Sequence, residues 1–137
     1  MSKAPWLITG AAAAALVAVV ALSGGGDRPG DGTSHHPTPR PEITNAKVLP
    51  VSFVPRTPGS AEAYAAARTA SETLDGVYCY CDCSKHAGHR SLLTCFETEH
   101  GAYCDICMGE AMVASAMAQQ GKSLMEIRAA IDRQFGT

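Results

Sequence analysis

The sequence predicts an all-α fold: a small cysteine-rich bundle of three or four short helices behind an N-terminal hydrophobic segment and a disordered linker. Two observations predict it. Apolar residues recur at helical spacing in the second half of the chain, and no strand pattern surrounds the cysteines there. All six cysteines lie between residues 79 and 107. With 137 residues, the chain has room for one small domain.

Residues 1–23 form the first segment. Lys3 is followed by residues 4–23, which carry no charge and are rich in alanine and valine. This pattern is typical of a signal peptide or a membrane anchor. Small residues near Ser23 leave cleavage open. A short N-terminus with a lysine favours a cytoplasmic start, so we expect the cysteine domain on the extracytoplasmic side of the cell membrane.

Residues 24–58 form a Pro/Gly-rich linker. Their composition cannot bury enough apolar surface to order itself, which predicts a flexible tether. Residues 48–54 are more apolar and could dock along the domain as an extended arm. The pair His35 and His36 has too few neighbouring donors for a metal site, so we interpret it as solvated.

Residues 59–137 form the cysteine-rich helical domain. Ser60 can cap a first helix that runs from Ala61 to Leu74. Residues 90–96 are long enough for two helical turns, and residues 103–120 form a longer helix that Gly121 closes. Ser123 and Glu126 predict a capping box for the last helix, whose apolar residues recur every three or four positions.

A core of this size supplies only a few kcal/mol, so the cysteines must help to hold the domain. In an extended segment Cys79, Cys81 and Cys83 point to the same side, which suits three thiolates on a soft cation better than a disulfide within the run. Cys104 and Cys107 form a C-x-x-C at a helix start, where the helix dipole stabilises a thiolate.

These residues predict a metal site for copper or zinc. Histidines in the intervening loops could complete the ligand shell, and a methionine beside Cys107 would suit Cu(I). The candidate ligands are Cys79, Cys81, Cys83, Cys95, Cys104, Cys107, His89, His100 and Met108. The expected role is sequestration or delivery of the ion by a membrane-tethered protein, not catalysis, because no phosphate loop or paired-carboxylate motif is present.

Two alternatives remain open. Six cysteines in an exported domain could form three disulfides, in any one of fifteen possible connectivities. These disulfides would stabilise an interaction module that binds another protein of the cell envelope. Less favoured is a thiol-disulfide oxidoreductase that uses Cys104 and Cys107, because the thioredoxin-like reading needs a βαβ context. A net charge of -2 with mixed signs predicts no nucleic-acid partner.

Three cysteine segments resemble a known family. They are Cys79-Tyr80-Cys81-Asp82-Cys83, the stretch from Gly88 to Phe96, and the stretch from His100 to Cys107. In order and neighbourhood they are similar to the bacterial lipoprotein family named for its PCYCGC motif, with Tyr78 in place of the proline and Asp82 in place of the glycine. The resemblance implies location and architecture, and no catalytic residue. Gly24 stands where a lipobox has its lipidated cysteine, so we expect no lipid anchor.

Overall fold

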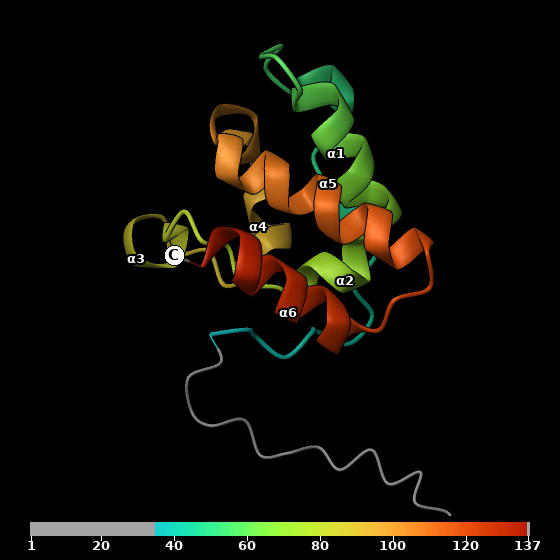
Figure 1. Cartoon of the computed structure of the whole chain (residues 1–137). Helices are drawn as coiled ribbons and strands as arrows, with labels where there is room; N and C mark the ends of the chain where they lie inside the picture. Colours follow the sequence, from blue (N-terminus) through green and yellow to red (C-terminus); the bar gives the residue numbers. More distant parts are fainter. Residues whose placement is uncertain (1–34, 137) are drawn as a thin grey trace, which may run out of the picture. The chain divides into compact units, whose positions relative to one another are not determined.

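The computed structural model describes residues 35–136, and within them every regular element is helical (Figure 1). The all-α prediction is confirmed for this part of the chain. The α-helices are α1 (Ser60–Thr69), α2 (Ser71–Asp75), α3 (Cys83–His86), α4 (Leu92–Phe96), α5 (Asp105–Gln119) and α6 (Leu124–Phe135). The 3-10 helices η1 (Asn45–Lys47) and η2 (Val51–Phe53) precede α1, and η3 (Glu99–Tyr103) lies between α4 and α5.

The hydrophobic segment predicted to enter or cross a membrane, residues 4–23, lies outside the described residues. Between residues 35 and 136, no helix has both the length and the apolar character that crossing a bilayer requires.

The first predicted helix is two helices in the structure. The chain leaves helical geometry at Ala70, whose φ is -122° and ψ 35°, and α2 begins at the next residue. Ser60 is the first residue of α1, and Gly59 caps the helix with a φ of 81°. The Ser60 hydroxyl instead donates to the carbonyl oxygens of Pro55 and Thr57. It therefore fixes the loop that enters α1.

Helices α1 and α5 form the centre of the bundle and pack on one another (Figure 1). Their contacting faces are built from small residues that are fully buried, including Ala63, Ala67, Ala111 and Ala114. Small side chains let the two backbones approach closely. Beside them, Tyr64 and Phe96 pack edge to face with ring centroids 5.0 Å apart.

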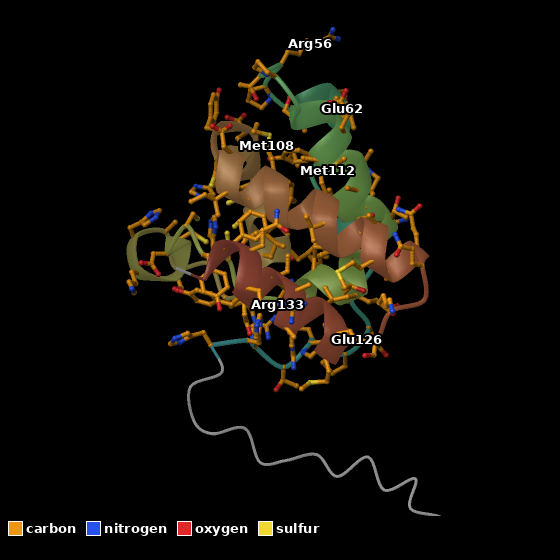
Figure 2. The ribbon with its side chains drawn as sticks, in the orientation of Figure 1. Arg56, Glu62, Met108, Met112, Glu126 and Arg133 are labelled. Carbon is orange, nitrogen blue, oxygen red and sulfur yellow. The ribbon has the colours of Figure 1, made fainter. Side chains whose placement is uncertain are left out.

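Helix α6 covers the bundle through Ile127 and Ile131, which are buried. The predicted capping box is confirmed: the Ser123 hydroxyl accepts the Glu126 N–H, and the Glu126 carboxylate accepts the Ser123 N–H. Glu126 and Arg133 lie on the solvent-exposed side of the helix (Figure 2). The helix is therefore amphipathic, as its spacing predicts.

Residues 35–58, the described part of the predicted linker, pack on the bundle. Ile43, Val48 and Val54 are buried, and residues 51–53 form a 3-10 turn where we expected an extended arm. The main anchor is the buried carboxylate of Asp75, which accepts hydrogen bonds from the Arg40 backbone and guanidinium. Composition alone underestimated this segment, because Ile43, Val48 and Val54 are buried in the core and Arg40 finds an acidic partner in Asp75.

His36 is a structural residue, contrary to the solvated interpretation. Its side chain is 3 % exposed. Its Nδ1 accepts the Tyr78 N–H at 3.0 Å, and its Nε2 lies 2.7 Å from Asp132 Oδ1. Since Nδ1 must stay unprotonated to accept, the ring is the neutral tautomer that donates from Nε2. His36 thus ties the N-terminal arm to the residue just before Cys79.

Candidate metal centre

Six cysteines and two histidines gather where α3, α4, η3 and the start of α5 meet. No disulfide bond joins any of the six cysteines in the structure. The sulfur atoms of Cys79 and Cys107 lie 3.3 Å apart, as do those of Cys83 and Cys95. Four of these cysteines are fully buried, whereas Cys81 and Cys104 are partly exposed. The sequence prediction that separate cysteine segments converge is therefore correct.

The Cys79–Cys83 segment converges through a turn and not through an extended strand. The Asp82 N–H donates to the Cys79 carbonyl oxygen, and Asp82 has a φ of 59° in the left-handed region. Cys83 then begins α3. The three sulfurs lie within 4.8 Å of one another. Aspartate is one of the few non-glycine residues that adopt this conformation at low cost, which explains how it occupies the glycine position of the motif.

Two acidic side chains hold this turn in place. The Tyr80 N–H donates to Glu110 Oε1 at 2.9 Å, and the Tyr80 hydroxyl donates to Asp132 Oδ1 at 2.6 Å. Tyr80 also packs on Tyr78 with ring centroids 5.2 Å apart. Helices α5 and α6 therefore position the sulfurs of the turn through the residue between two of them.

Cys104 caps the N-terminus of α5, as its C-x-x-C position predicts. Its sulfur accepts the Cys107 N–H at 3.3 Å. Hydrogen bonds from the Cys107 side chain and backbone lower the pKa of Cys104 to about 6, against the effect of burial. Cys104 is therefore a thiolate at neutral pH, the form that binds a metal or attacks a disulfide.

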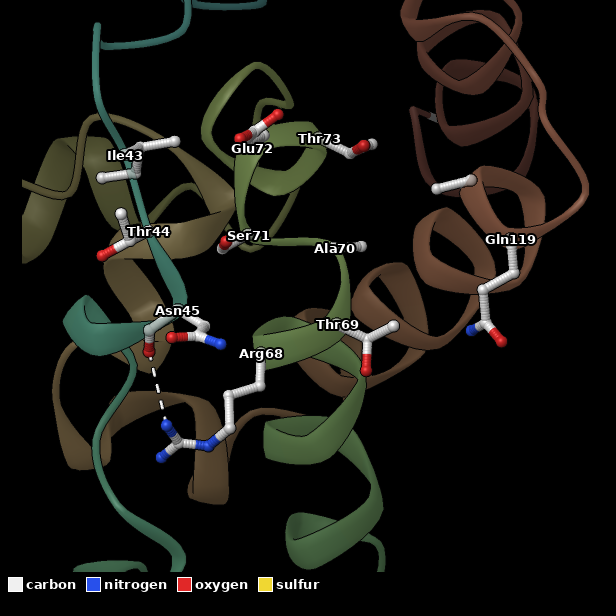
Figure 3. Close-up of a pocket in the computed structure, with 11 residues that line it drawn as sticks. Ile43, Thr44, Asn45, Arg68, Thr69, Ala70, Ser71, Glu72, Thr73 and Gln119 are labelled. Atoms are coloured by element: carbon white, nitrogen blue, oxygen red, sulfur yellow. Dashed lines mark hydrogen bonds between the residues drawn. The ribbon is translucent and has the colours of Figure 1, made fainter.

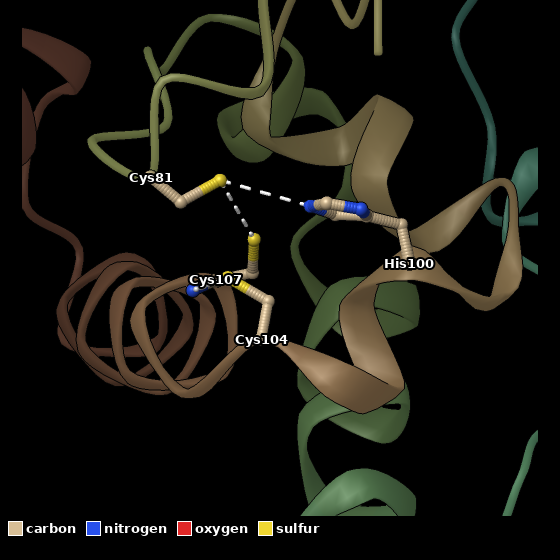
Figure 4. Close-up of side chains that lie close together, drawn as sticks. All are labelled: Cys81, His100, Cys104 and Cys107. Carbon is tan, nitrogen blue, oxygen red and sulfur yellow. Dashed lines mark hydrogen bonds between the residues drawn. The ribbon is translucent and has the colours of Figure 1, made fainter. Parts of the chain in front are cut away.

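One group of four donors consists of Cys81, His100, Cys104 and Cys107, whose ligand atoms all lie within 4.8 Å of one another (Figure 4). The Cys81 sulfur lies 3.7 Å from His100 Nε2 and 3.6 Å from the Cys107 sulfur. We call this group the outer set, because three of its members are partly exposed and Cys107 alone is buried.

A further group of four donors consists of Cys83, His89, Cys95 and His100, again within 4.8 Å. His89 Nδ1 lies 3.4 Å from the Cys95 sulfur. We call this group the inner set, because Cys83 and Cys95 are 1 % and 0 % exposed. Cys95, which stands apart from both clusters in the sequence, is thus a full member of the site.

Electrostatics in the centre favour a bound cation. Burial, followed by the nearby Cys79 thiolate, raises the pKa of Cys81, and burial likewise raises the pKa of Cys83. The pKa of Cys79 is lowered, first by the hydrogen bond from Cys107. Within residues 35–136, the side-chain hydrogen bonds to these sulfurs come from cysteine and histidine, and none comes from lysine or arginine. Only a cation would let all six thiols ionise together.

One further candidate from the sequence is Met108. Met108 Sδ is 3.8 Å from the position that a Cβ on Gly59 would take, so this side chain packs on the start of α1 (Figure 2). Met108 therefore packs against the hydrophobic core near the start of α1. His86 is exposed, and its Nε2 lies 3.4 Å from the Cys81 carbonyl oxygen.

Glu110 is the residue of the centre that the sequence analysis missed. It is 0 % exposed, and its Oε2 has no hydrogen-bond partner. Burial, followed by the adjacent Cys79 thiolate, raises its pKa to about 10, so the carboxyl is neutral at physiological pH. A signal for it existed, because Glu110 follows Cys107 by three residues and so shares its helix face.

A surface pocket of about 610 Å³ lies at the break between α1 and α2, at the opposite end of α5 from Cys104 (Figure 3). Arg68 crosses it and donates to the Asn45 carbonyl oxygen at 3.3 Å. The lining residues include no cysteine and no histidine. The pocket is therefore separate from the sulfur centre.

Comparison of this chain with known proteins identifies its family. No curated protein and no solved structure matches this chain. The model of a family described as "Protein of unknown function with PCYCGC motif" matches residues 16–137, which extends the likeness seen in the three cysteine segments to nearly the whole chain. The chain belongs to this PCYCGC family.

Proposed function

We propose that this protein binds a soft metal ion, copper or zinc, in the cell envelope and sequesters or delivers it. The observation that carries the proposal is the outer set, in which three sulfurs and one imidazole nitrogen lie within 4.8 Å of one another. The residues come from three segments: the Cys79–Cys83 turn, η3 and the start of α5. The fold therefore brings donors from three separate segments together.

The donor chemistry selects the ion. Three thiolates and one imidazole form a ligand set typical of structural zinc, and thiolates also favour Cu(I). Oxygen-preferring ions such as Mg²⁺ and Ca²⁺ find no carboxylate in either set. A four-donor site leaves no open position for substrate, which supports a binding role over a catalytic one.

Partial exposure of the outer set supports exchange with a partner. Cys81, His100 and Cys104 each reach the surface in part, so a thiol of another envelope protein can approach the ion from that side. Transfer between thiolate sites proceeds through such shared ligands, and the attacking thiol needs access. A fully enclosed site would serve only to stabilise the fold.

The proposed location is the extracytoplasmic face of the cell membrane. It depends on residues 4–23, an uncharged stretch long enough to span a bilayer, with Lys3 before it. The partners would be the metal ion, the membrane through this stretch, and an envelope protein that gives or receives the ion.

The oxidised alternative has its own support. The 3.3 Å between the Cys83 and Cys95 sulfurs exceeds a disulfide bond by only about 1.3 Å. In an oxidising compartment such pairs could form disulfides that staple an interaction module. The low pKa of Cys104 likewise suits thiol–disulfide exchange that uses Cys104 and Cys107.

Two measurements on full-length protein purified without added metal test the proposal. Elemental analysis gives the bound metal, and alkylation of a separate sample without reductant counts the free thiols. We expect copper or zinc to co-purify and most cysteines to be free thiols. Cys104→Ser is expected to lower the metal content, whereas the matched Met108→Leu, which removes a sulfur that packs on Gly59, leaves it unchanged. Six blocked cysteines with no bound ion would contradict the proposal and support the disulfide alternative.

A further inference from the structure

The inner set is a second group of four donors, and three of its residues, Cys83, His89 and Cys95, are absent from the outer set. Cys83 begins α3, Cys95 lies in α4, and His89 lies in the loop between these helices. Their ligand atoms, with His100, lie within 4.8 Å of one another. Only His100 belongs to both four-donor groups. The two groups therefore comprise seven different residues.

Four distances, two within each group, lie within about 0.5 Å of the edges of a tetrahedral site. With a Zn–S bond of about 2.3 Å and a Zn–N bond of about 2.05 Å, a tetrahedron has S···S edges of about 3.8 Å and S···N edges of about 3.6 Å. The Cys95 to His89 distance is 3.4 Å, and the Cys81 to His100 distance is 3.7 Å. The Cys83 and Cys95 sulfurs, 3.3 Å apart, are about 0.5 Å closer than the tetrahedral S···S edge. They are about 1.3 Å farther apart than the two sulfurs of a disulfide bond.

A single ion cannot use all of these donors. A tetrahedral ion takes four ligands, and six thiols and two imidazoles are available. An ion in the outer set would leave Cys79, Cys83 and Cys95 without a cation, and all three are at most 2 % exposed. The inner set then has the sulfurs and nitrogens to hold an ion of its own.

Cys79 lies between the two sets. Its sulfur is 3.5 Å from Cys81 and 3.3 Å from Cys107, which are outer ligands. It also lies within 4.8 Å of Cys83 in one group and of Cys95 in another, which are inner ligands. A thiolate with ligands of both sets around it is placed to bridge two ions. If Cys79 is a ligand of both ions, the imidazole of His100 needs to bind only one of them.

We propose that the centre holds a pair of soft ions, Zn²⁺ or Cu(I), with the Cys79 thiolate bridging the outer and inner sets. This inference rests on the proposed metal-binding function and adds its stoichiometry and ligand assignment. Charge is consistent with it: a pair of Zn²⁺ ions offsets four of the six thiolate charges and a pair of Cu(I) ions offsets two, whereas a single ion offsets half as many. The paired centre thus leaves less uncompensated charge in a buried site.

Native mass spectrometry of the full-length chain, loaded with Zn²⁺ alone and cleared of loosely bound metal, counts the ions. We expect a pair on the unaltered chain and on Met108→Leu. Cys95→Ser and Cys104→Ser each remove a donor from one set only, so each variant is expected to keep a single ion. Circular dichroism checks that the variants fold.

The outcomes separate this inference from the proposed function. An unaltered chain that saturates with a single ion overturns the paired centre and leaves the metal-binding function standing. A chain that binds no ion overturns both. Two ions on both cysteine variants would overturn the ligand assignment, and the count on the unaltered chain decides the stoichiometry even if a variant fails to fold.

The bridge has its own readout. Co²⁺ titration of the full-length chain, followed by electron paramagnetic resonance, is expected to show a signal that grows over the first equivalent and falls over the second. The fall occurs because a shared thiolate couples the two spins. Cys79→Ser is expected to abolish the fall. A signal that keeps growing through the second equivalent in the unaltered chain would overturn the bridging role.

Discussion

Glu110 Oε1 accepts the Tyr80 N–H at 2.9 Å, so a buried carboxyl on α5 fixes the backbone between Cys79 and Cys81. The contact joins residues that are thirty positions apart in the sequence. It places the turn sulfurs against those of the C-x-x-C. The carboxyl is neutral because its pKa is raised to about 10, first by burial.

Glu110→Ala is expected to destabilise the protein by about 1–3 kcal/mol, because the Tyr80 N–H loses its partner inside the domain. Glu110→Gln is the matched control: it keeps an acceptor oxygen and resembles the neutral acid. We expect it to cost much less. Urea denaturation under reducing conditions at pH 7 measures both free energies of unfolding. Equal losses for the two variants would show that the hydrogen bond does not position the turn.

Asp75 gives the protein a sensitivity to acid. Burial opposes its ionised form, but the Arg40 side chain and backbone and the Ser91 hydroxyl donate to it, and the net effect lowers its pKa. A depressed folded-state pKa contributes stability that is present above the unfolded value, near 3.9, and is lost as pH falls below it.

Asp75→Asn is therefore expected to lower the free energy of unfolding at pH 7 by about 2 kcal/mol and to lessen its fall below pH 4. Urea denaturation between pH 3 and pH 7 checks this. Glu72→Gln, an exposed acid in the same helix, serves as the control and should follow the unaltered protein. Parallel curves for Asp75→Asn and the unaltered protein would contradict the role of Asp75.

Asp82 tests the backbone requirement of the turn. Its φ of 59° suits glycine, asparagine and aspartate. Asp82→Asn and Asp82→Gly are expected to change stability little, whereas Asp82→Val should cost about 1–2 kcal/mol because a β-branched residue clashes in this conformation. Thermal unfolding of the three variants compares them. A valine variant as stable as the glycine variant would rule out the left-handed turn.

Metal uptake should release protons. Burial and neighbouring thiolates raise the pKa of Cys81 and Cys83, so these thiols are protonated in the free protein and must deprotonate to bind. We expect the apparent Zn²⁺ affinity to fall as pH drops from about 8 to about 6. Calorimetry in two buffers of different ionisation enthalpy counts the protons. Uptake with no proton release would mean that the ion does not meet these thiols.

Local signals in the sequence predicted the parts of the fold that depend on nearby residues. The capping box at Ser123 and the apolar spacing up to Ile131 are such signals, and α6 follows them. The break at Ala70 was missed because no glycine or proline marks it. It arises where Arg68 reaches the carbonyl oxygens of the N-terminal arm, a contact between distant segments.

The candidate site was predictable as a cluster but not as two sets. Close spacing in the sequence brings Cys79, Cys81 and Cys83 together in any compact fold. The partnership of Cys95 with Cys83 and His89 depends on how α4 packs, which no local pattern shows. His36 was missed for the same reason, since its partners Tyr78 and Asp132 are far away in the sequence.

Exposure of the donors is graded, and in the proposed metal centre this gradient would set an order of exchange. Cys81, His100 and Cys104 meet solvent in part, while Cys83 and Cys95 do not. In the proposed paired centre, a chelator or an acceptor thiol would therefore reach the outer ion first, and the inner ion would leave only when the fold opens. One chain would then hold a rapidly exchanging pool and a retained pool, so that it supplies metal to a partner and keeps its own structure while doing so.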